Sequence, residues 1–144
     1  MESPLPARDP GSVQRPLTIL LVDDNRADCE LLREALGEIP IAVDLVTYDD
    51  ASAFVGQLPA QVELPDLVIL DVGMPCLDGY AVLAEVRRAW PSVPVVVMSA
   101  AAFRDREARA LAGGARAFLT KQQRFDDHLK VVRTALAYAG SAAG

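Results

Sequence analysis

Short apolar runs alternate along the chain with stretches in which apolar residues recur every three or four positions. The runs fit strands that are buried on both faces, and the periodic stretches fit helices that cover a sheet. The expected strands are residues 17–22, 43–46, 67–70, 95–98 and 117–120. The expected helices are residues 26–36, 51–58, 79–90, 105–112 and 126–138. Five such repeats predict a parallel sheet with helices on both faces.

The order of the strands follows from the handedness of their connections. Right-handed crossovers leave few topologies for five βα repeats, and the strand order 2-1-3-4-5 is the common small one. We therefore expect an α/β fold of the doubly wound, flavodoxin-like type, with five parallel strands and five helices. In this order the first and third strands lie side by side, and a crevice opens at their carboxyl ends.

The length of 144 residues fits one domain. Residues 1–16 contain four prolines and little apolar surface, so we expect them to form a flexible N-terminal tail. The domain itself is expected at residues 17–139, followed by a short C-terminal tail at residues 140–144 and no output domain.

The composition argues against several classes of partner. The net charge is −6, whereas a nucleic-acid surface needs clustered Lys and Arg, so no nucleic-acid partner is expected. The longest apolar runs have the length of strands, so no membrane span is expected either. The two cysteines, Cys29 and Cys76, lack metal-ligand spacing, and no signal segment opens the chain, which indicates a cytoplasmic location.

Carboxylates directly follow two of the expected strands. Asp23 and Asp24 come after the first strand and Asp71 after the third, so the topology brings all three to one crevice. Acids at the ends of buried strands need a compensating cation, and Mg²⁺ prefers oxygen ligands. We expect Asp24, Asp71 and the backbone carbonyl of Gly73 to bind Mg²⁺, and Asp23 to bind it through a water.

A hydroxyl and an ammonium group follow two further strands. Ser99 follows the fourth strand and Lys121 the fifth. Together with the acids they form a set of groups for phosphoryl transfer, in which a carboxylate oxygen of Asp71 attacks phosphorus. Lys121, Ser99 and backbone N–H groups such as that of Ala100 would bind the phosphoryl oxygens. Lysine suits such a point-charge position better than the planar guanidinium of arginine.

Plainer interpretations exist for each of these residues. Any one of the acids alone is as readily a helix cap or a solvated loop residue, and Ser99 could simply satisfy backbone groups. His128, the only histidine, is expected on the surface and remote from the acids. Arg104, Arg106 and Arg109 are expected on a solvated helix face, where they could also contact a partner.

Four stretches of the sequence resemble the receiver domain of two-component response regulators. They are residues 19–25, 70–79, 98–100 and 118–121, and the resemblance extends over residues 17–139. It implies that Asp71 is the phosphoacceptor and that a histidine kinase donates the phosphoryl group. It also implies a signalling receiver that promotes its own phosphorylation and dephosphorylation, not an enzyme in the usual sense.

The same resemblance makes Ser99 and Phe118 a switch pair. Their rearrangement is expected to change the surface of the fourth helix, fifth strand and fifth helix, where a downstream protein or a phosphotransfer partner binds. A finer similarity, in residues 24–28 and the loop at 59–65, is to single-domain regulators paired with bacterial phytochrome kinases. Regulators of that group often dimerise, which implies a homodimer through the last helices.

The sequence departs from the family pattern within the site. Gln122 stands where the family has a proline in a cis bond, so the turn into the last helix is expected to differ. Gly73 and Ala101 offer no polar side chain to orient a water, which predicts slow or partner-dependent dephosphorylation. A phosphatase with an aspartyl-phosphate intermediate would need a second acid at Gly73. A vestigial scaffold would lack an acid, the hydroxyl or the lysine, and all are present.

Overall fold

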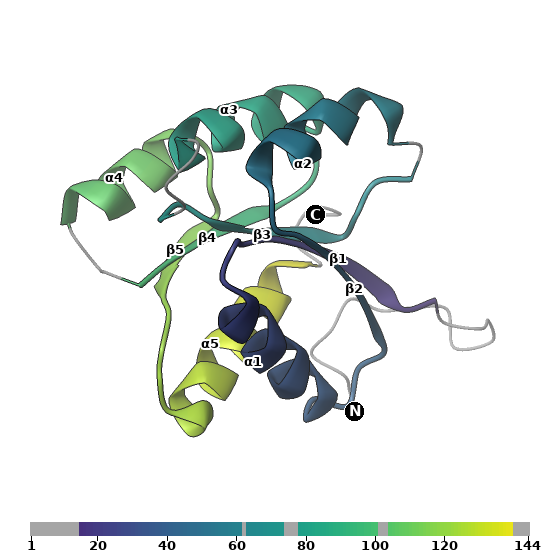
Figure 1. Ribbon diagram of the computed structural model, residues 1–144, viewed down its shortest axis with the longest axis vertical. Helices are drawn as coiled ribbons and strands as arrows, with labels where there is room; N and C mark the ends of the chain where they lie inside the picture. The colour runs from purple at the N-terminus through teal and green to yellow at the C-terminus, as the bar shows by residue number, and fades with distance from the viewer. Residues whose placement is uncertain (1–14, 62, 74–77, 101–103, 140–144) are drawn as a thin grey trace.

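The computed structural model describes residues 15–61, 63–73, 78–100 and 104–139 (Figure 1). Strands and helices alternate along it as predicted. In chain order the elements are β1 (Leu17–Val22), α1 (Arg26–Gly37), β2 (Val43–Tyr48), α2 (Ala51–Gln57), a 3₁₀ turn (Leu58–Ala60), β3 (Leu67–Asp71), α3 (Gly79–Ala89), β4 (Val95–Ser99), α4 (Arg104–Ala112), β5 (Ala117–Thr120) and α5 (Phe125–Ala137). Most of the two expected tails, 1–16 and 140–144, lies outside the described residues.

The five strands form one parallel sheet in the order β2-β1-β3-β4-β5. This confirms the expected doubly wound, flavodoxin-like fold. Val22 at the end of β1 pairs with Tyr48 of β2 on one side and with Leu70 of β3 on the other. Asp71, the last residue of β3, pairs with Met98, one residue before the end of β4. The carboxyl ends of β1, β3 and β4 therefore meet at one edge of the sheet.

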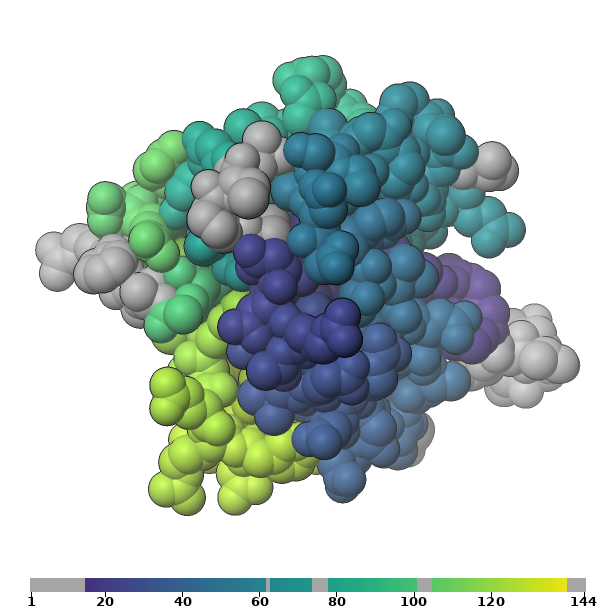
Figure 2. All heavy atoms as spheres, viewed as in Figure 1, coloured from purple at the N-terminus to yellow at the C-terminus, as the bar shows by residue number. Residues whose placement is uncertain are grey.

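Helices cover both faces of this sheet. α1 and α5 lie on one face, and α2, α3 and α4 lie on the other (Figure 1). The same two layers are visible on the surface of the molecule, where α1 is dark blue and α5 is yellow-green (Figure 2). Successive strand residues point to opposite faces, so Leu20 and Val22 enter the core beneath α2–α4, and Ile19 and Leu21 enter the core beneath α1 and α5.

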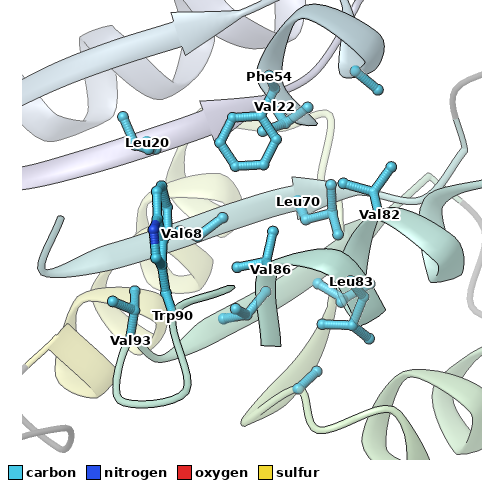
Figure 3. Close-up of a cluster of buried hydrophobic side chains, with 14 of the residues drawn as sticks. Leu20, Val22, Phe54, Val68, Leu70, Val82, Leu83, Val86, Trp90 and Val93 are labelled. Atoms are coloured by element: carbon cyan, nitrogen blue, oxygen red, sulfur yellow. The ribbon is translucent and has the colours of Figure 1, made fainter. Parts of the chain in front are cut away.

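Aromatic and aliphatic side chains fill the core beneath α2–α4 (Figure 3). Phe54 of α2 and Trp90 meet edge to face, with ring centroids 6.1 Å apart. The other labelled members of this core are Leu20, Val22, Val68, Leu70, Val82, Leu83, Val86 and Val93. Burying each large aliphatic side chain contributes about 1.5–3 kcal/mol. This packing fixes the strands whose ends carry the polar residues.

Side-chain caps begin the helices close to where the sequence predicted. The Oδ1 of Asn25 accepts a hydrogen bond from the N–H of Asp28 at 3.0 Å, which satisfies a free donor at the start of α1. Asp50 caps α2 in the same way. The predicted end of α2 at residue 58 is wrong by one residue, because Pro59 follows and a 3₁₀ turn replaces the last helical turn. Among the described helices, none is long and apolar enough to cross a membrane.

Two predictions about burial on the α1 and α5 side are wrong. His128 was expected on the surface, yet it is 4% exposed, because it lies on the face of α5 that packs toward α1 and the sheet. In α1, the spacing of Ala27, Leu31 and Ala35 predicts an apolar stripe, but Ala27 is exposed and Cys29 is buried instead. The buried face of α1 is therefore rotated from the predicted stripe, and its buried residues are Cys29, Leu32, Ala35 and Leu36.

Candidate functional site

Three carboxylates converge where β1 and β3 end. Asp23, Asp24 and Asp71 each offer an oxygen, and these oxygens all lie within 4.8 Å of one another. Asp23 and Asp71 are buried, whereas Asp24 is exposed. Parallel pairing of β1 with β3 places the acids together, because Asp71 ends β3 and Asp23 directly follows β1. The structure thus brings together the three acids that the sequence selected.

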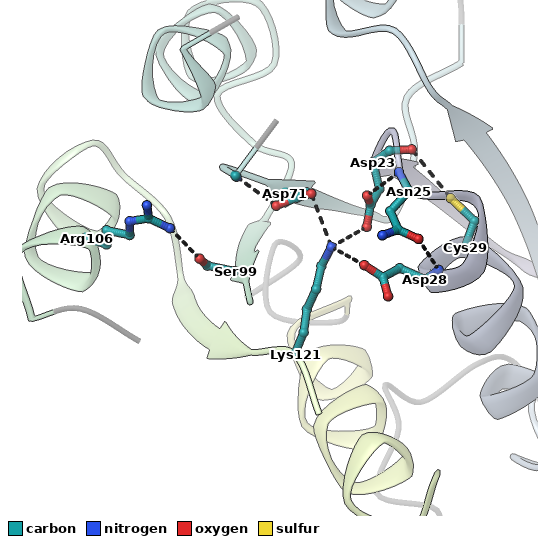
Figure 4. Close-up of polar contacts among 9 residues, drawn as sticks. Asp23, Asn25, Asp28, Cys29, Asp71, Ser99, Arg106 and Lys121 are labelled. Atoms are coloured by element: carbon teal, nitrogen blue, oxygen red, sulfur yellow. Dashed lines mark hydrogen bonds and ion pairs between the residues drawn. The ribbon is translucent and has the colours of Figure 1, made fainter. Parts of the chain in front are cut away.

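Hydrogen bonds fix the carboxylate of Asp71 through both oxygens. Its Oδ1 accepts a hydrogen bond from the backbone N–H of Gly73 at 2.8 Å, and its Oδ2 accepts one from Lys121 Nζ at 3.1 Å (Figure 4). A Cβ at position 73 would lie 3.3 Å from Asp71 Oδ1. Glycine at this position therefore lets the backbone approach the carboxylate closely.

Lys121 is the centre of the polar cluster. It follows β5, and its ammonium donates to Asp23 at 2.8 Å, to Asp28 at 2.7 Å and to Asp71 at 3.1 Å (Figure 4). An ammonium group has three donors, so all three N–H bonds are used by carboxylates. Lys121 thus lies where the sequence predicted, in contact with the expected phosphoacceptor.

Asp28 is a member of the site that the sequence analysis did not select. It lies in the first turn of α1 and gives the shortest of the three contacts to Lys121. The available signal was its place in the first turn of the expected helix at residues 26–36, which begins three residues after Asp23. A carboxylate in that position adds negative charge to the cluster.

Burial and charge shift the pKa values of two groups in the cluster. Burial is the main cause that raises the pKa of the Asp23 carboxyl to about 6, and repulsion from Asp71 adds to it, against hydrogen bonds from Lys121 and Asn25. For Lys121, burial disfavours the charged form, but hydrogen bonds to Asp23 and Asp28 outweigh it and raise the pKa of the ammonium. Lys121 therefore stays protonated at neutral pH.

The donor set of this cluster fits a hard divalent cation. The carboxylates of Asp23, Asp24 and Asp71 lie close together, and the single ammonium of Lys121 contacts two of them, so the region is negatively charged. Mg²⁺ prefers oxygen ligands and is commonly bound by one or two carboxylates together with waters. The expected ligands Asp24 and Asp71 both belong to this group of carboxylates, and their roles as ligands remain predictions. The assignments of the Gly73 carbonyl as a ligand and of Asp23 as a ligand through water remain predictions.

Ser99 lies at the same edge of the sheet, as expected. It is the last residue of β4, is fully buried, and accepts a hydrogen bond at its Oγ from Arg106 Nη1 at 3.0 Å (Figure 4). Arg106 was predicted on a solvated face of α4, but it is half-buried and directed to Ser99. Nothing in the sequence signalled this contact, because it depends on how the chain passes from β4 into α4.

The remaining expected site residues lie beside these. Ala100 directly follows Ser99 and is exposed, and its role in binding a phosphoryl oxygen remains a prediction. Phe118 of β5 is half-buried against the core beneath α2–α4, and its role as a switch also remains a prediction. The described residues contain no cis peptide bond, so Gln122 follows Lys121 in trans. Ala101 and Cys76 lie outside the described residues.

Behind Lys121 lies a small cavity of about 20 Å³. Its lining includes Asp28, Lys121, Gln122 and His128. Neither ring nitrogen of His128 has a hydrogen-bond partner among the described residues. Burial lowers the pKa of His128, and Lys121 lowers it further, while Asp28 acts in the opposite direction. His128 is therefore a neutral, buried side chain close to the site and not the surface residue that was predicted.

The fold and the site define a known class of protein. The family described as the response regulator receiver domain matches residues 19–133. The chain therefore belongs to the receiver domain family of two-component response regulators, as its motifs predicted.

Relatives of similar length lie within this family. Response regulator Rcp1 from Synechocystis sp. is 32% identical over 125 residues, which cover 82% of this chain and 85% of Rcp1. The crystal structure of the Mn²⁺-bound form of Rcp1 matches with a TM-score of 0.73 at 31% identity, covering 83% of this chain and 91% of that one. The phosphorylated cyanobacterial phytochrome response regulator RcpA gives a TM-score of 0.75 at 28% identity, covering 90% and 97%.

Other relatives are much longer than the matched region. The protein-glutamate methylesterase/protein-glutamine glutaminase of Symbiobacterium thermophilum is 39% identical over 111 residues, which cover 76% of this chain but 30% of that protein. The chain thus spans less than a third of that relative. This similarity supports membership of the same family and does not extend to the activity of the longer protein.

Proposed function

We propose that the protein is a response regulator whose Asp71 accepts a phosphoryl group from a histidine kinase in the presence of Mg²⁺. The observation that carries this proposal is the contact between Lys121 and Asp71 inside a cluster of three close carboxylates. A buried ammonium beside a buried carboxylate at the end of a parallel strand can balance the charge of an incoming phosphoryl group. Mg²⁺ is the implied cofactor.

The proposed phosphoryl transfer requires few rearrangements of side chains. A carboxylate oxygen of Asp71 forms a bond to phosphorus while the N–P bond of the kinase phosphohistidine breaks, and the electron pair leaves with the imidazole. Lys121 would release part of its hold on the acids and donate to a phosphoryl oxygen. The hydroxyl of Ser99 and the N–H of Ala100 would donate to the others. The backbone N–H of Gly73 keeps the Asp71 carboxylate oriented throughout.

When bound by Asp24, Asp71 and the Gly73 carbonyl, with Asp23 acting through a water, Mg²⁺ would neutralise charge on the phosphoryl oxygens. The chain's own contribution is to keep these oxygen donors together despite their repulsion. Lys121 makes that possible, because its ammonium contacts two of the three acids at the same time.

Ser99 and Phe118 would transmit the change at the phosphorylation site to the surface of the domain. Ser99 ends β4, and Phe118 of β5 pairs with Val97 of β4, two residues before Ser99. Movement of Ser99 toward the phosphoryl group would let the Phe118 ring turn inward, and a two-state rearrangement of this kind would alter the surface of α4, β5 and α5. A downstream protein or a phosphotransfer partner would read that surface.

The partners and setting are part of this proposal. The similarity to Rcp1 and to the phytochrome response regulator RcpA supports a phytochrome-type histidine kinase as the donor. The proposal also includes a receiver domain at residues 17–139, a cytoplasmic location and a homodimer through α5. Gly73 and Ala101 lack polar side chains to orient a hydrolytic water, so the domain would promote its own dephosphorylation only slowly.

Phosphoramidate tests the proposal, because it carries its phosphoryl group on nitrogen as a phosphohistidine does. Incubation with Mg²⁺ should add one phosphoryl group to the intact mass of the wild type. The addition should be absent with a chelator and in Asp71→Asn. The matched control Asp44→Asn removes an exposed carboxylate of β2 and should be phosphorylated like the wild type. Equal phosphorylation of Asp71→Asn would reject the proposal.

A further inference from the structure

A buried histidine beside the polar cluster carries atoms that the described part of the chain does not satisfy. His128 of α5 is 4% exposed, and neither of its ring nitrogens has a hydrogen-bond partner within the ranges that the structure describes. Buried polar groups are nearly always hydrogen-bonded, either to protein or to an ordered water. The ring therefore needs a partner other than the side chains and backbone of these ranges.

The cavity that His128 lines has the size of one water molecule. Its volume is about 20 Å³, and a buried water needs at least about 10–15 Å³. A water site also needs roughly two to four polar partners. Asp28, Lys121 and Gln122 line the same cavity as His128. In so small a space, polar atoms that line it lie close enough to share one water.

Among the charged residues that line the cavity, Asp28 has the most acceptor capacity left for a water. The ammonium of Lys121 already donates all three N–H bonds to carboxylates. Asp23 accepts at both oxygens, from the N–H of Asn25 at 2.9 Å and from Lys121 at 2.8 Å. Asp28 accepts from Lys121 at one oxygen, Oδ2, and an ionised carboxylate has about four lone-pair sites.

We propose that this cavity is a binding site for a single water molecule, which joins the ring of His128 to the carboxylate of Asp28. An ionised carboxylate has only acceptors, so the water donates one proton to Asp28 and forms its second hydrogen bond with a ring nitrogen of His128. A bridging water is nearly as favourable in enthalpy as a direct hydrogen bond. It satisfies one ring nitrogen, and the other stays without a partner in the described ranges.

The bridge connects α5 to the cation of the site. Asp28 belongs to α1 and accepts the hydrogen bond from Lys121 at 2.7 Å (Figure 4). A chain of contacts thus runs from His128 through the water and Asp28 to the ammonium of Lys121. The inference goes beyond the proposed function and does not depend on it, because the cavity and its polar lining do not require a phosphoryl group on Asp71.

Oxygen-17 magnetic relaxation dispersion tests the site, because it counts water molecules that stay buried long enough to tumble with the protein. The whole chain is measured with a chelator present, beside His128→Phe, which keeps a ring but removes both nitrogens. The wild type should hold about one more such water than His128→Phe. Lys130→Gln changes an exposed residue of α5 and should give the wild-type count. Equal counts in the wild type and His128→Phe would overturn the inference.

A second variant removes the space and keeps the polar partners. Leu31 of α1 also lines the cavity, and Leu31→Phe places a larger side chain beside it while His128 and Asp28 are unchanged. This variant should lose the same water, with circular dichroism confirming that the fold is intact. Retention of the water in both folded variants would show that it binds elsewhere and would overturn the inference.

A high-resolution crystal structure of the wild type tests the bridge even if either variant fails to fold. It should show one water at about 2.5–3.2 Å from a ring nitrogen of His128 and from an oxygen of Asp28. A dry cavity, or a water that contacts His128 and not Asp28, would overturn the inference. These outcomes are separate from the proposed function, which fails only if Asp71 of the wild type takes up no phosphoryl group in Mg²⁺.

Discussion

The ammonium of Lys121 lies closer to Asp28 than to Asp71, with Nζ–Oδ2 distances of 2.7 Å and 3.1 Å. Asp28 therefore competes with the phosphoacceptor for the cation that the phosphoryl group needs. It also adds a negative charge close to the place where the phosphoryl group, which is itself an anion, must bind. The strength of this competition sets how readily Lys121 turns to the phosphoryl oxygen.

Replacing Asp28 by asparagine should release Lys121 toward Asp71. We expect beryllofluoride to bind Asp28→Asn about two- to fivefold more tightly than the wild type, the size of effect usual for a partly exposed ion pair. Titration followed by fluorine NMR measures it. Glu30→Gln removes an equal charge from an exposed position of α1 and should leave the affinity unchanged. Weaker binding by Asp28→Asn would mean that Asp28 orients Lys121 and does not compete for it.

Metal binding should depend on the exposed acid of the cluster. Asp24→Asn removes one of the three close carboxylates, and we expect the dissociation constant for Mg²⁺ to rise roughly tenfold or more. Wild-type protein at a Mg²⁺ concentration of one hundred times its dissociation constant should gain about 2.7 kcal/mol of unfolding free energy by mass action. Calorimetric titration and thermal unfolding check both values. Unchanged affinity in Asp24→Asn would exclude this residue as a ligand.

The metal-free protein should change stability with pH through Asp23. Its folded pKa of about 6 lies above the ordinary value of 3.8, so between these pH values the folded state binds more protons than the unfolded state. The contribution of Asp23 to the free energy of unfolding is therefore largest at acidic pH and falls as the pH rises through 6, by on the order of 1–3 kcal/mol.

Urea unfolding with a chelator present, at pH 4.5 and 7.5, measures this effect as a difference between the wild type and Asp23→Asn. The variant should be more stable relative to the wild type at pH 7.5 than at pH 4.5, because it lacks the buried charge. A constant difference between the two proteins across this range would contradict the assigned pKa.

Titration of His128 should change the free energy of unfolding in the direction opposite to that of Asp23. Burial lowers its pKa below 6.5, so the folded state binds fewer protons than the unfolded state, and stability is lost as the pH falls below about 6.5. Because it is the only histidine, its ring protons give a single NMR titration curve. His128→Leu removes two ring nitrogens that have no hydrogen-bond partner within the described part of the chain, and it should raise the free energy of unfolding by about 1 kcal/mol. A measured pKa of 6.5 or higher would contradict this account.

The sequence predicted those site residues whose place is set by topology. Asp23, Asp71, Ser99 and Lys121 each end or directly follow a strand, so the strand order alone brings them to one edge. The same reasoning holds for the sheet itself, because apolar runs mark buried parallel strands regardless of how the helices pack.

Residues on helices were harder to place. Asp28, Arg106 and His128 lie on α1, α4 and α5, and their contacts depend on how each helix is rotated about its axis and where it starts. A helix rotated by one residue turns a side chain by about 100°, which decides between solvent and site. His128 is an example, because polarity alone predicted solvent for a side chain that the packing of α5 buries.

The central claim is that folding gathers a divalent ion, the Asp71 carboxylate and the Lys121 ammonium around one phosphoryl group. The most direct measurement is the location of the covalent product after reaction with phosphoramidate and Mg²⁺. Borohydride reduces an acyl phosphate to an alcohol, so peptide mass spectrometry should find homoserine at position 71 in the wild type. Phosphate on His128, or reduction at a carboxylate other than Asp71, would contradict the account.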